Sequence, residues 1–185
     1  MALVLASRSP QRRAILEQLG VPFTVRPADV AEEIAGEPHA VAAANARAKA
    51  LAAEARAGET VLAVDTLVTL DRELWGKPAG PDAARDTLAR LSGRTHDVVS
   101  GLALAGAGED VRVATAATAV AFRPLDDALL DWYVATGEWH GRAGGYAIQG
   151  RGAALVRRVE GDYLNVVGLP VATLLDLWPD LLGGP

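Results

Sequence analysis

The chain opens with the stretch Leu3-Val-Leu-Ala-Ser-Arg-Ser-Pro-Gln-Arg-Arg13, whose pattern predicts a strand, a tight turn and a helix. The apolar run from Leu3 to Ala6 is typical of a short buried strand. Ser9 suits the N-cap position, and Pro10 suits the first helical position, where a missing N–H removes no hydrogen bond. Gly20 is expected to end the helix.

The predicted turn between this strand and helix carries hydroxyl groups and three arginines, Arg8, Arg12 and Arg13. Unpaired backbone N–H groups and the positive end of the helix dipole point into such a turn. A turn of this kind binds phosphate. The alternative interpretation is a capped surface helix with solvated arginines, and the segment alone does not decide between the two.

Length and composition favour a single domain over residues 1–185, with half of the residues apolar and able to form a substantial core. The chain has no cysteine, which excludes disulfides, thiolate metal sites and a cysteine nucleophile. Its net charge of −5 argues against non-specific binding to nucleic acid or to an anionic membrane. No segment resembles a signal peptide or a membrane span, so we expect a cytoplasmic protein.

The rest of the pattern predicts alternating strands and helices. Strands are expected at residues 21–25, 61–70, 73–78, 98–104, 111–122, 153–159 and 163–167, and helices at 39–57, 80–91, 126–136 and 170–178. The two long strands at 98–104 and 111–122 indicate the centre of a mixed sheet. The tail Gly183–Pro185 is expected to be frayed.

One carboxylate, Asp65, lies in the middle of the strongest strand pattern, residues 61–70. A carboxylate in a buried strand costs free energy unless it is paired, hydrogen-bonded or bound to a metal. Asp65 is therefore the best single candidate for chemistry, with a purely structural role as the alternative.

Two lysines are further candidates. Lys49 follows Asn45 by four residues on a predicted helix, so both side chains can face the same space, although a solvated lysine is the simpler interpretation of Lys49 alone. Asp71-Arg72 predicts a tight turn, and the resulting hairpin would bring Lys77 back towards Asp65. Lys77 fits a surface loop equally well.

The segment 141–152 contains five glycines, which would allow its backbone to approach a ligand closely. Within it, Gln149 carries both a donor and an acceptor and suits recognition of a base edge. The alternative is a flexible surface loop, although Tyr146 and Ile148 are too apolar for a purely solvated one.

The candidate residues form one chemical set, because cations suit phosphate and carboxylates such as Glu32 and Glu33 suit a divalent metal. An oxygen-liganded ion such as Mg²⁺ or Mn²⁺ fits, since the chain has only three histidines and they do not stand at ligand spacing. No Walker A sequence is present, and no GxGxxG follows a strand, so neither a P-loop nor a Rossmann nucleotide site is predicted.

Five segments, in order and over nearly the whole chain, resemble the Maf family. They read Leu5-Ala-Ser-Arg-Ser-Pro-Gln-Arg12, Ala63-Val-Asp-Thr66, Gly76-Lys-Pro78, Leu91-Ser-Gly-Arg-Thr-His96 and Ala143-Gly-Gly-Tyr-Ala-Ile-Gln-Gly-Arg-Gly152. Members are nucleoside triphosphate pyrophosphatases related in fold to the inosine triphosphate pyrophosphatases. The resemblance implies an α/β fold with a mixed, strongly twisted sheet flanked by helices, and with two lobes around a central cleft.

The resemblance also implies hydrolysis between the α- and β-phosphates with Mg²⁺ or Mn²⁺, giving a nucleoside monophosphate and pyrophosphate. Phosphate-binding residues would be Ser7, Arg12, Lys49 and Lys77. Glu32 would help to bind the metal, and Asp65 would be the catalytic base or a metal ligand. An Asp-Thr pair with an Ile-Gln-Gly loop is similar to the branch that takes dTTP and UTP, so Thr66 and Gln149 would read the pyrimidine. The family further suggests a homodimer.

One position departs from the family's pattern. Gln11 stands where the family has the first arginine of Ser-Pro-Arg-Arg, and Arg8 is a candidate to compensate for that loss. Three rival functions stay open: a pyrophosphatase for methylated GTP or for inosine or xanthosine triphosphate, a non-catalytic nucleotide-binding regulator of septum formation and cell division, and a structural α/β domain.

Overall fold

The computed structural model describes residues 1–183, so residues 184 and 185 of the expected frayed tail lie outside the described range. Seven strands form one mixed sheet in the order β2-β1-β3-β5-β6-β7, with β4 paired to β3 alone. Their bounds are β1 Ala2–Leu5, β2 Phe23–Val25, β3 Glu59–Leu70, β4 Glu73–Trp75, β5 Thr95–Gly106, β6 Arg112–Phe122 and β7 Val156–Glu160. Strand β1 is parallel to β2 and β3, and the other pairs are antiparallel.

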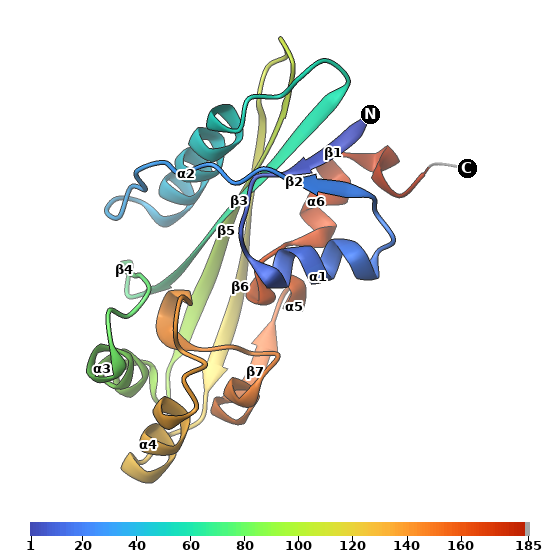
Figure 1. Cartoon of the computed structure of the whole chain (residues 1–185). Coiled ribbons are helices and arrows are strands. Elements are labelled where there is room, and N and C mark those ends of the chain that lie inside the picture. The colour runs from blue at the N-terminus through green and yellow to red at the C-terminus, as the bar shows by residue number, and fades with distance from the viewer. Residues whose placement is uncertain (184–185) are drawn as a thin grey trace.

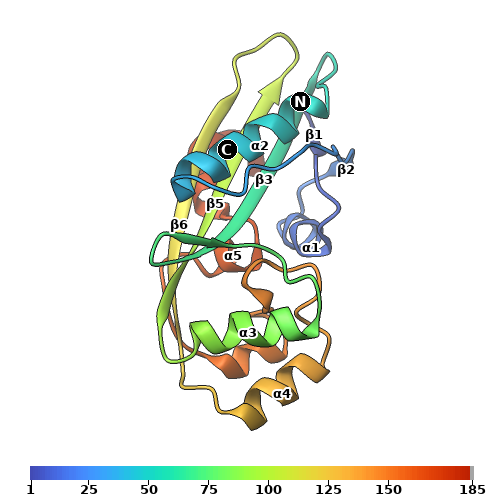
Figure 2. The same ribbon diagram turned by 90° about the vertical axis from the view of Figure 1, so that its left-hand side faces the viewer.

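Helices cover the sheet at both ends of its long strands (Figures 1 and 2). Their bounds are α1 Pro10–Gln18, α2 Pro38–Ala52, α3 Pro81–Leu91, α4 Asp127–Ala135, α5 Tyr163–Val167 and α6 Val171–Leu177, with 3₁₀ turns η1 Ala143–Gly145, η2 Arg151–Leu155 and η3 Pro179–Leu182. In Figure 1, α2 and α1 lie on opposite faces at one end, and α3 and α4 lie together at the other. None of the helices within residues 1–183 is long and apolar enough to cross a membrane.

Successive side chains of β3 point to opposite faces of the sheet, and different helices pack against each face. Leu62 and Val64 pack on one face against residues of α1 and α6. Val61 and Ala63 point to the other face, where α2 contributes alanines to a core of small residues. Asp65 continues this second row, so its carboxylate lies on the α2 side of the sheet.

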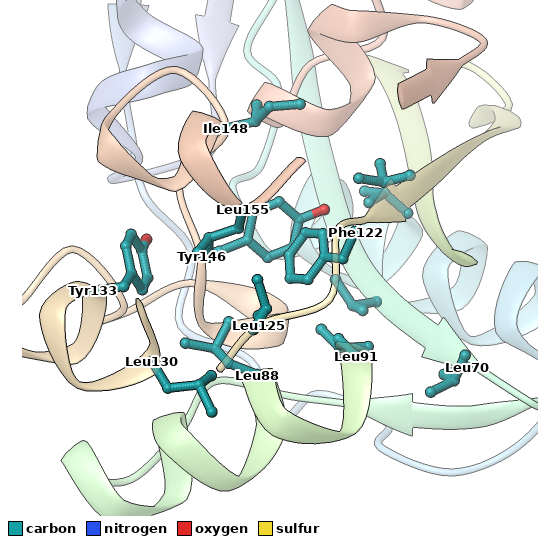
Figure 3. Packing of buried hydrophobic residues seen from close by; sticks show 13 residues of the cluster. Leu70, Leu88, Leu91, Phe122, Leu125, Leu130, Tyr133, Tyr146, Ile148 and Leu155 are labelled. Atoms are coloured by element: carbon teal, nitrogen blue, oxygen red, sulfur yellow. The ribbon is translucent and has the colours of Figure 1, made fainter. Parts of the chain in front are cut away.

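A separate core fills the end of the sheet opposite α1 and α2 (Figure 3). It joins α3, α4, the distal ends of β3 and β6, and the segment after α4 through Leu70, Leu88, Leu91, Phe122, Leu130, Tyr133, Tyr146 and Leu155. The long strands thus carry two clusters at one end, on opposite faces of the sheet, and a third at the other end, which gives the molecule the two lobes that the family resemblance implies. The middle of β3 lies between them.

Residues 163–167 form helix α5, so the prediction of a strand there is wrong. The carboxylate of Asp162 caps the helix by accepting a hydrogen bond from the N–H of Leu164 (2.8 Å), and Gly168 ends it with a φ of 129°. Asn165 is fully buried and donates to the carbonyl of Val98 (2.9 Å), which anchors the turn to β5. A short apolar run does not distinguish a strand from a buried helical turn, and these tertiary contacts decide between them.

Several other boundaries differ from the prediction. Strand β4 ends at Trp75 rather than at residue 78, and strand β5 runs from Thr95 to Gly106 rather than over residues 98–104. Helix α2 ends at Ala52 rather than at residue 57, because Glu54 adopts a left-handed backbone conformation with a φ of 49°. Strand β7 begins at Val156 rather than at residue 153, because the glycine-rich segment first forms the 3₁₀ turn η2. Of the predicted site residues, only Lys77 changes its assignment, from the strand to the residues that follow it.

Gly101 on β5 sets the distance between α2 and the sheet. It pairs in register with Asp65 on β3. A Cβ atom added at Gly101 would lie 2.2 Å from the carbonyl oxygen of Ala42 on α2, closer than any packing allows. The helix backbone therefore rests directly on the strand, which brings the next turns of α2, with Asn45 and Lys49, over Asp65.

We predict that Gly101→Ala will lower the free energy of unfolding by about 1–3 kcal/mol, because the added methyl group forces α2 off the sheet. The measurement is urea denaturation. Gly106→Ala on the same strand is the matched control, since its Cβ would meet only the movable carboxylate of Glu109. Equal stabilities for Gly101→Ala and the wild type would contradict this account of the packing.

Candidate active site

A cleft of about 990 Å³ opens beside the middle of β3. Its walls come from the β1–α1 turn, the acidic segment before α2, the β3–β4 hairpin and the segment after α4. The structure brings all the predicted site residues to this cleft: Ser7, Arg12, Glu32, Lys49, Asp65, Thr66, Lys77 and Gln149. They come from distant parts of the chain.

Asp65 is buried, with 5% of its surface exposed, and both carboxylate oxygens have partners. Lys49 Nζ lies 2.6 Å from Oδ1, and Asn45 Nδ2 donates to Oδ2 at 2.9 Å. The same Lys49 ammonium lies 2.6 Å from Glu32 Oε1. The side chain of Lys49 is only 12% exposed, so its interpretation as a solvated helix lysine is wrong.

Asn45 has a role that sequence reasoning missed. Its Oδ1 accepts a hydrogen bond from the N–H of Glu33 (2.8 Å), and its Nδ2 donates to the carbonyl of Glu33 (3.0 Å) as well as to Asp65. One buried amide therefore fixes the acidic segment that carries Glu32 and also orients the buried carboxylate. The available signal was the four-residue spacing of Asn45 and Lys49, which places both polar side chains on one otherwise alanine-rich face of α2.

The β1–α1 turn has the predicted capped form and holds Arg12 rigidly. Ser9 Oγ accepts a hydrogen bond from the N–H of Arg12 (3.4 Å), and Pro10 begins the helix. The Arg12 guanidinium donates to Ser7 Oγ (2.9 Å), to Thr66 Oγ1 (3.2 Å) and to the carbonyl of Gly168 (2.9 Å). These three acceptors are neutral, so they position the charge without cancelling it.

The protonation of Arg12 reflects opposing effects. Burial lowers its pKa to about 10, whereas the negative charges of Asp65 and Glu32 raise it. The pKa stays well above neutrality, so Arg12 carries its positive charge into the cleft under physiological conditions. A charge held between neutral acceptors in a partly buried site is suited to an anionic ligand.

The three arginines of the turn have different surroundings. Only Arg12 is held inside the cleft by the turn and by β3. Arg8 lies at the cleft wall but is exposed and forms a bidentate ion pair with Asp29, with N···O distances of 2.6 and 3.0 Å. Arg13 lies outside the cleft lining, 3.8 Å from Glu17. Arg8 therefore has a carboxylate partner that an anionic ligand would have to replace, unlike Arg12.

Lys77 reaches the cleft by the hairpin that the sequence predicts. Asp71 and Arg72 form its tight turn with φ values of 54° and 68°, and β4 then returns along β3. Lys77 is exposed at the cleft, and no carboxylate of residues 1–183 forms an ion pair with it. Its charge is available to a ligand.

The glycine-rich segment is held by aromatic anchors, so it is not a flexible surface loop. Tyr146 OH is 2.9 Å from Nε2 of the buried His96, and the N–H of Ala147 donates to Tyr133 OH at 2.9 Å. Burial lowers the pKa of His96 to about 4, so this histidine is neutral. These anchors present Gln149, which is exposed, at the cleft.

The carboxylates of the cleft suit a metal that arrives with a ligand. Within residues 1–183, no group of three or more histidine, cysteine, aspartate or glutamate side chains is arranged to hold a metal ion. Glu32 and Asp65 are, however, drawn together by the single ammonium of Lys49. Mg²⁺ is commonly held by one or two carboxylates together with phosphate oxygens and water, and the donor set fits that mode.

The cleft brings together cations, a helix N-terminus and two neighbouring carboxylates. This combination is typical of the class of proteins that bind phosphorylated ligands. The comparison with known families agrees with this class. The model of the family described as Maf-like protein matches residues 2–180, and the chain belongs to the Maf family.

The relatives of the chain share most of its length. A protein of Anaeromyxobacter sp. (strain Fw109-5) is 50% identical over 95% of this chain and 87% of its own. Relatives from Pyrococcus furiosus (43% identical) and Thermus thermophilus (48% identical) also match 95% of this chain, and 93% and 92% of their own. All three are named dTTP/UTP pyrophosphatase. Among solved structures, a HAM1 protein from Coxiella burnetii, 19% identical, covers 66% of this chain and 73% of its own with a TM-score of 0.48.

We predict that Asn45→Ala will lower the free energy of unfolding by about 1–3 kcal/mol, because it removes a hydrogen bond to the buried carboxylate of Asp65 and two to the backbone of Glu33. It should also accelerate hydrogen exchange at the Glu33 amide, which can be followed by NMR. Arg47→Ala, at an exposed position of the same helix, is the control. Unchanged protection of the Glu33 amide in Asn45→Ala would contradict the role of Asn45.

Proposed function

We propose that this chain is a nucleoside triphosphate pyrophosphatase that hydrolyses dTTP and UTP to the monophosphate and pyrophosphate. The observation that carries the proposal is the gathering of Arg12, Lys49 and Lys77 around the buried carboxylate of Asp65 in one cleft. The names of relatives that are 43–50% identical over most of their length support the same activity and substrates.

The cations of the cleft would neutralise the triphosphate. Pyrophosphate leaves readily only when its negative charge is balanced, and fixed cations in a partly enclosed site do this without reorganising. In this proposal Ser7 and Arg12 bind phosphate oxygens at the β1–α1 turn, and Lys77 binds them from the β3–β4 hairpin. Lys49 acts both on the phosphates and on the carboxylates beside it.

Glu32 and Asp65 would hold the divalent metal, Mg²⁺ or Mn²⁺, together with the phosphates. The ion would supply further charge neutralisation at the scissile phosphoanhydride. Lys49 keeps the two carboxylates close to each other, because its ammonium lies 2.6 Å from an oxygen of each. Removal of divalent metal should therefore abolish pyrophosphate release.

Asp65 is the proposed general base for the attacking water. Lys49 and Asn45 fix the orientation of its carboxylate, and burial excludes competing solvent. Thr66 and Gln149 are proposed to read the pyrimidine edge, since a polar group left unmatched by the wrong base carries a penalty. The setting proposed for this activity is the cytoplasm, with the chain acting as a homodimer.

The direct test is pyrophosphate release from a panel of triphosphates, with and without Mg²⁺ or Mn²⁺. We expect the highest kcat/KM for dTTP and UTP, and no release without metal. A higher value for inosine, xanthosine or methylated guanosine triphosphate would contradict the pyrimidine assignment. Tight binding of dTTP or UTP with metal but without pyrophosphate release would favour the non-catalytic regulator of septum formation.

We predict that Asp65→Asn will lower kcat by about 10²–10⁴-fold, because the amide cannot accept the proton of the attacking water. The measurement is steady-state pyrophosphate release from dTTP. Asp97→Asn, at an exposed position of β5, is the control and should keep wild-type turnover. Near-normal turnover in Asp65→Asn would remove Asp65 from the mechanism.

A further inference from the structure

Arg142 is a cation of the cleft to which sequence reasoning gave no role. It lies after α4, on the segment that leads into η1, and lines the cleft together with Gln11 and Arg12 of α1. Its Nε donates to the carbonyl of Glu138 (2.9 Å), which fixes the base of the guanidinium. The side chain is half-buried, so it is held against the protein rather than extended into solvent.

The end of the Arg142 guanidinium meets the amide of Gln11. The amide orientation is set by its partners: the nitrogen donates to Ser9 Oγ (3.0 Å), and the oxygen accepts from Arg142 Nη1 (3.1 Å) and Nη2 (3.0 Å). Gln11 belongs to the first turn of α1, whereas Arg142 comes from the segment that packs with α4. This hydrogen-bonded pair therefore joins the two lobes beside the β1–α1 turn.

The charge of Arg142 is not neutralised. Its partners are a backbone carbonyl and a side-chain amide, and no carboxylate of residues 1–183 forms an ion pair with it. Arg8 at the same cleft differs, because Asp29 binds both of its terminal nitrogens. Hydrogen bonds of a guanidinium to a neutral amide are weaker than those to an anionic oxygen, so a phosphate can displace Gln11.

We propose that Arg142 binds phosphate oxygens of the triphosphate, and that Gln11 holds its guanidinium in position before the substrate arrives. The planar fork of arginine suits bidentate binding of phosphate, and both Gln11 and Arg142 line the cleft in which a phosphate would replace the amide oxygen. When the substrate binds, its charged phosphate oxygens replace the neutral amide oxygen of Gln11 as the acceptors for Arg142. The phosphates then link the two lobes. The identity of the substrate rests on the function proposed above.

The first test measures KM for dTTP and UTP and the inhibition constant of inorganic tripolyphosphate, a probe without base or sugar. Arg142→Ala should raise all three by about 10- to 100-fold, the factor that corresponds to loss of charge-assisted hydrogen bonds. Arg142→Lys should recover part of the loss, and the salt dependence of KM should weaken in Arg142→Ala. Arg13→Ala, outside the cleft lining, should behave as the wild type.

Gln11→Glu provides a second variant that keeps the arginine and its packing. A carboxylate at this position would pair with Arg142 and compete with phosphate, so KM and the inhibition constant of tripolyphosphate should again rise. Thermal unfolding of each variant checks that the fold is intact. If Arg142→Ala raises KM but leaves the inhibition constant of tripolyphosphate unchanged, Arg142 contacts the base or the sugar and the proposal is overturned. Unchanged values of both KM and the inhibition constant would also overturn it.

Failure of the proposed function would be distinguishable from failure of this inference. If the wild type releases no pyrophosphate from any triphosphate, the enzymatic proposal fails. Calorimetric titration with inorganic tripolyphosphate still measures the phosphate site in that case. Weaker binding in Arg142→Ala than in the wild type would support the role of Arg142, and equal binding would overturn it.

Discussion

The buried ion pair between Asp65 and Lys49 is the constraint on which the rest of the structure depends. A carboxylate in the middle of a central strand is tolerated only with a cation and a hydrogen-bond donor beside it, and α2 supplies both through Lys49 and Asn45. The helix reaches this position because Gly101 lets its backbone rest on β5. The packing of α2 and the chemistry of the cleft therefore have a common origin.

The arginines that line the cleft have two kinds of environment: one is paired with a carboxylate, and two contact only neutral acceptors. Arg8 binds Asp29 at the cleft wall, and this pair contributes little to binding an anion. Arg12 and Arg142 instead contact hydroxyl, carbonyl and amide oxygens, which fix their geometry and leave their charge uncompensated. Gln11 differs from the arginine of the family's pattern, and the structure places the Arg142 guanidinium against it.

Local signals in the sequence predicted the strand–turn–helix at the N-terminus and the β3–β4 hairpin, and they singled out Asp65 in the middle of a buried strand. The family resemblance, rather than a local signal, supplied the roles of Glu32, Lys49 and most other residues that meet in the cleft. The helix α5 was not predictable, because the short apolar run 163–167 fits both structures and its capping and anchoring come from Asp162 and distant strands. The roles of Asn45 and Arg142 also depend on contacts between segments far apart in the chain. Such contacts leave no periodic signal in the sequence.

The central claim is that one cleft binds a triphosphate and a divalent metal around Asp65. A crystal structure with Mg²⁺ and a dTTP analogue that has a non-hydrolysable link between the α- and β-phosphates tests it most directly. The account predicts phosphate oxygens on Arg12 and Lys77, with the metal held by Glu32 and Asp65. A triphosphate bound away from the β1–α1 turn, or a metal held by neither carboxylate, would contradict it.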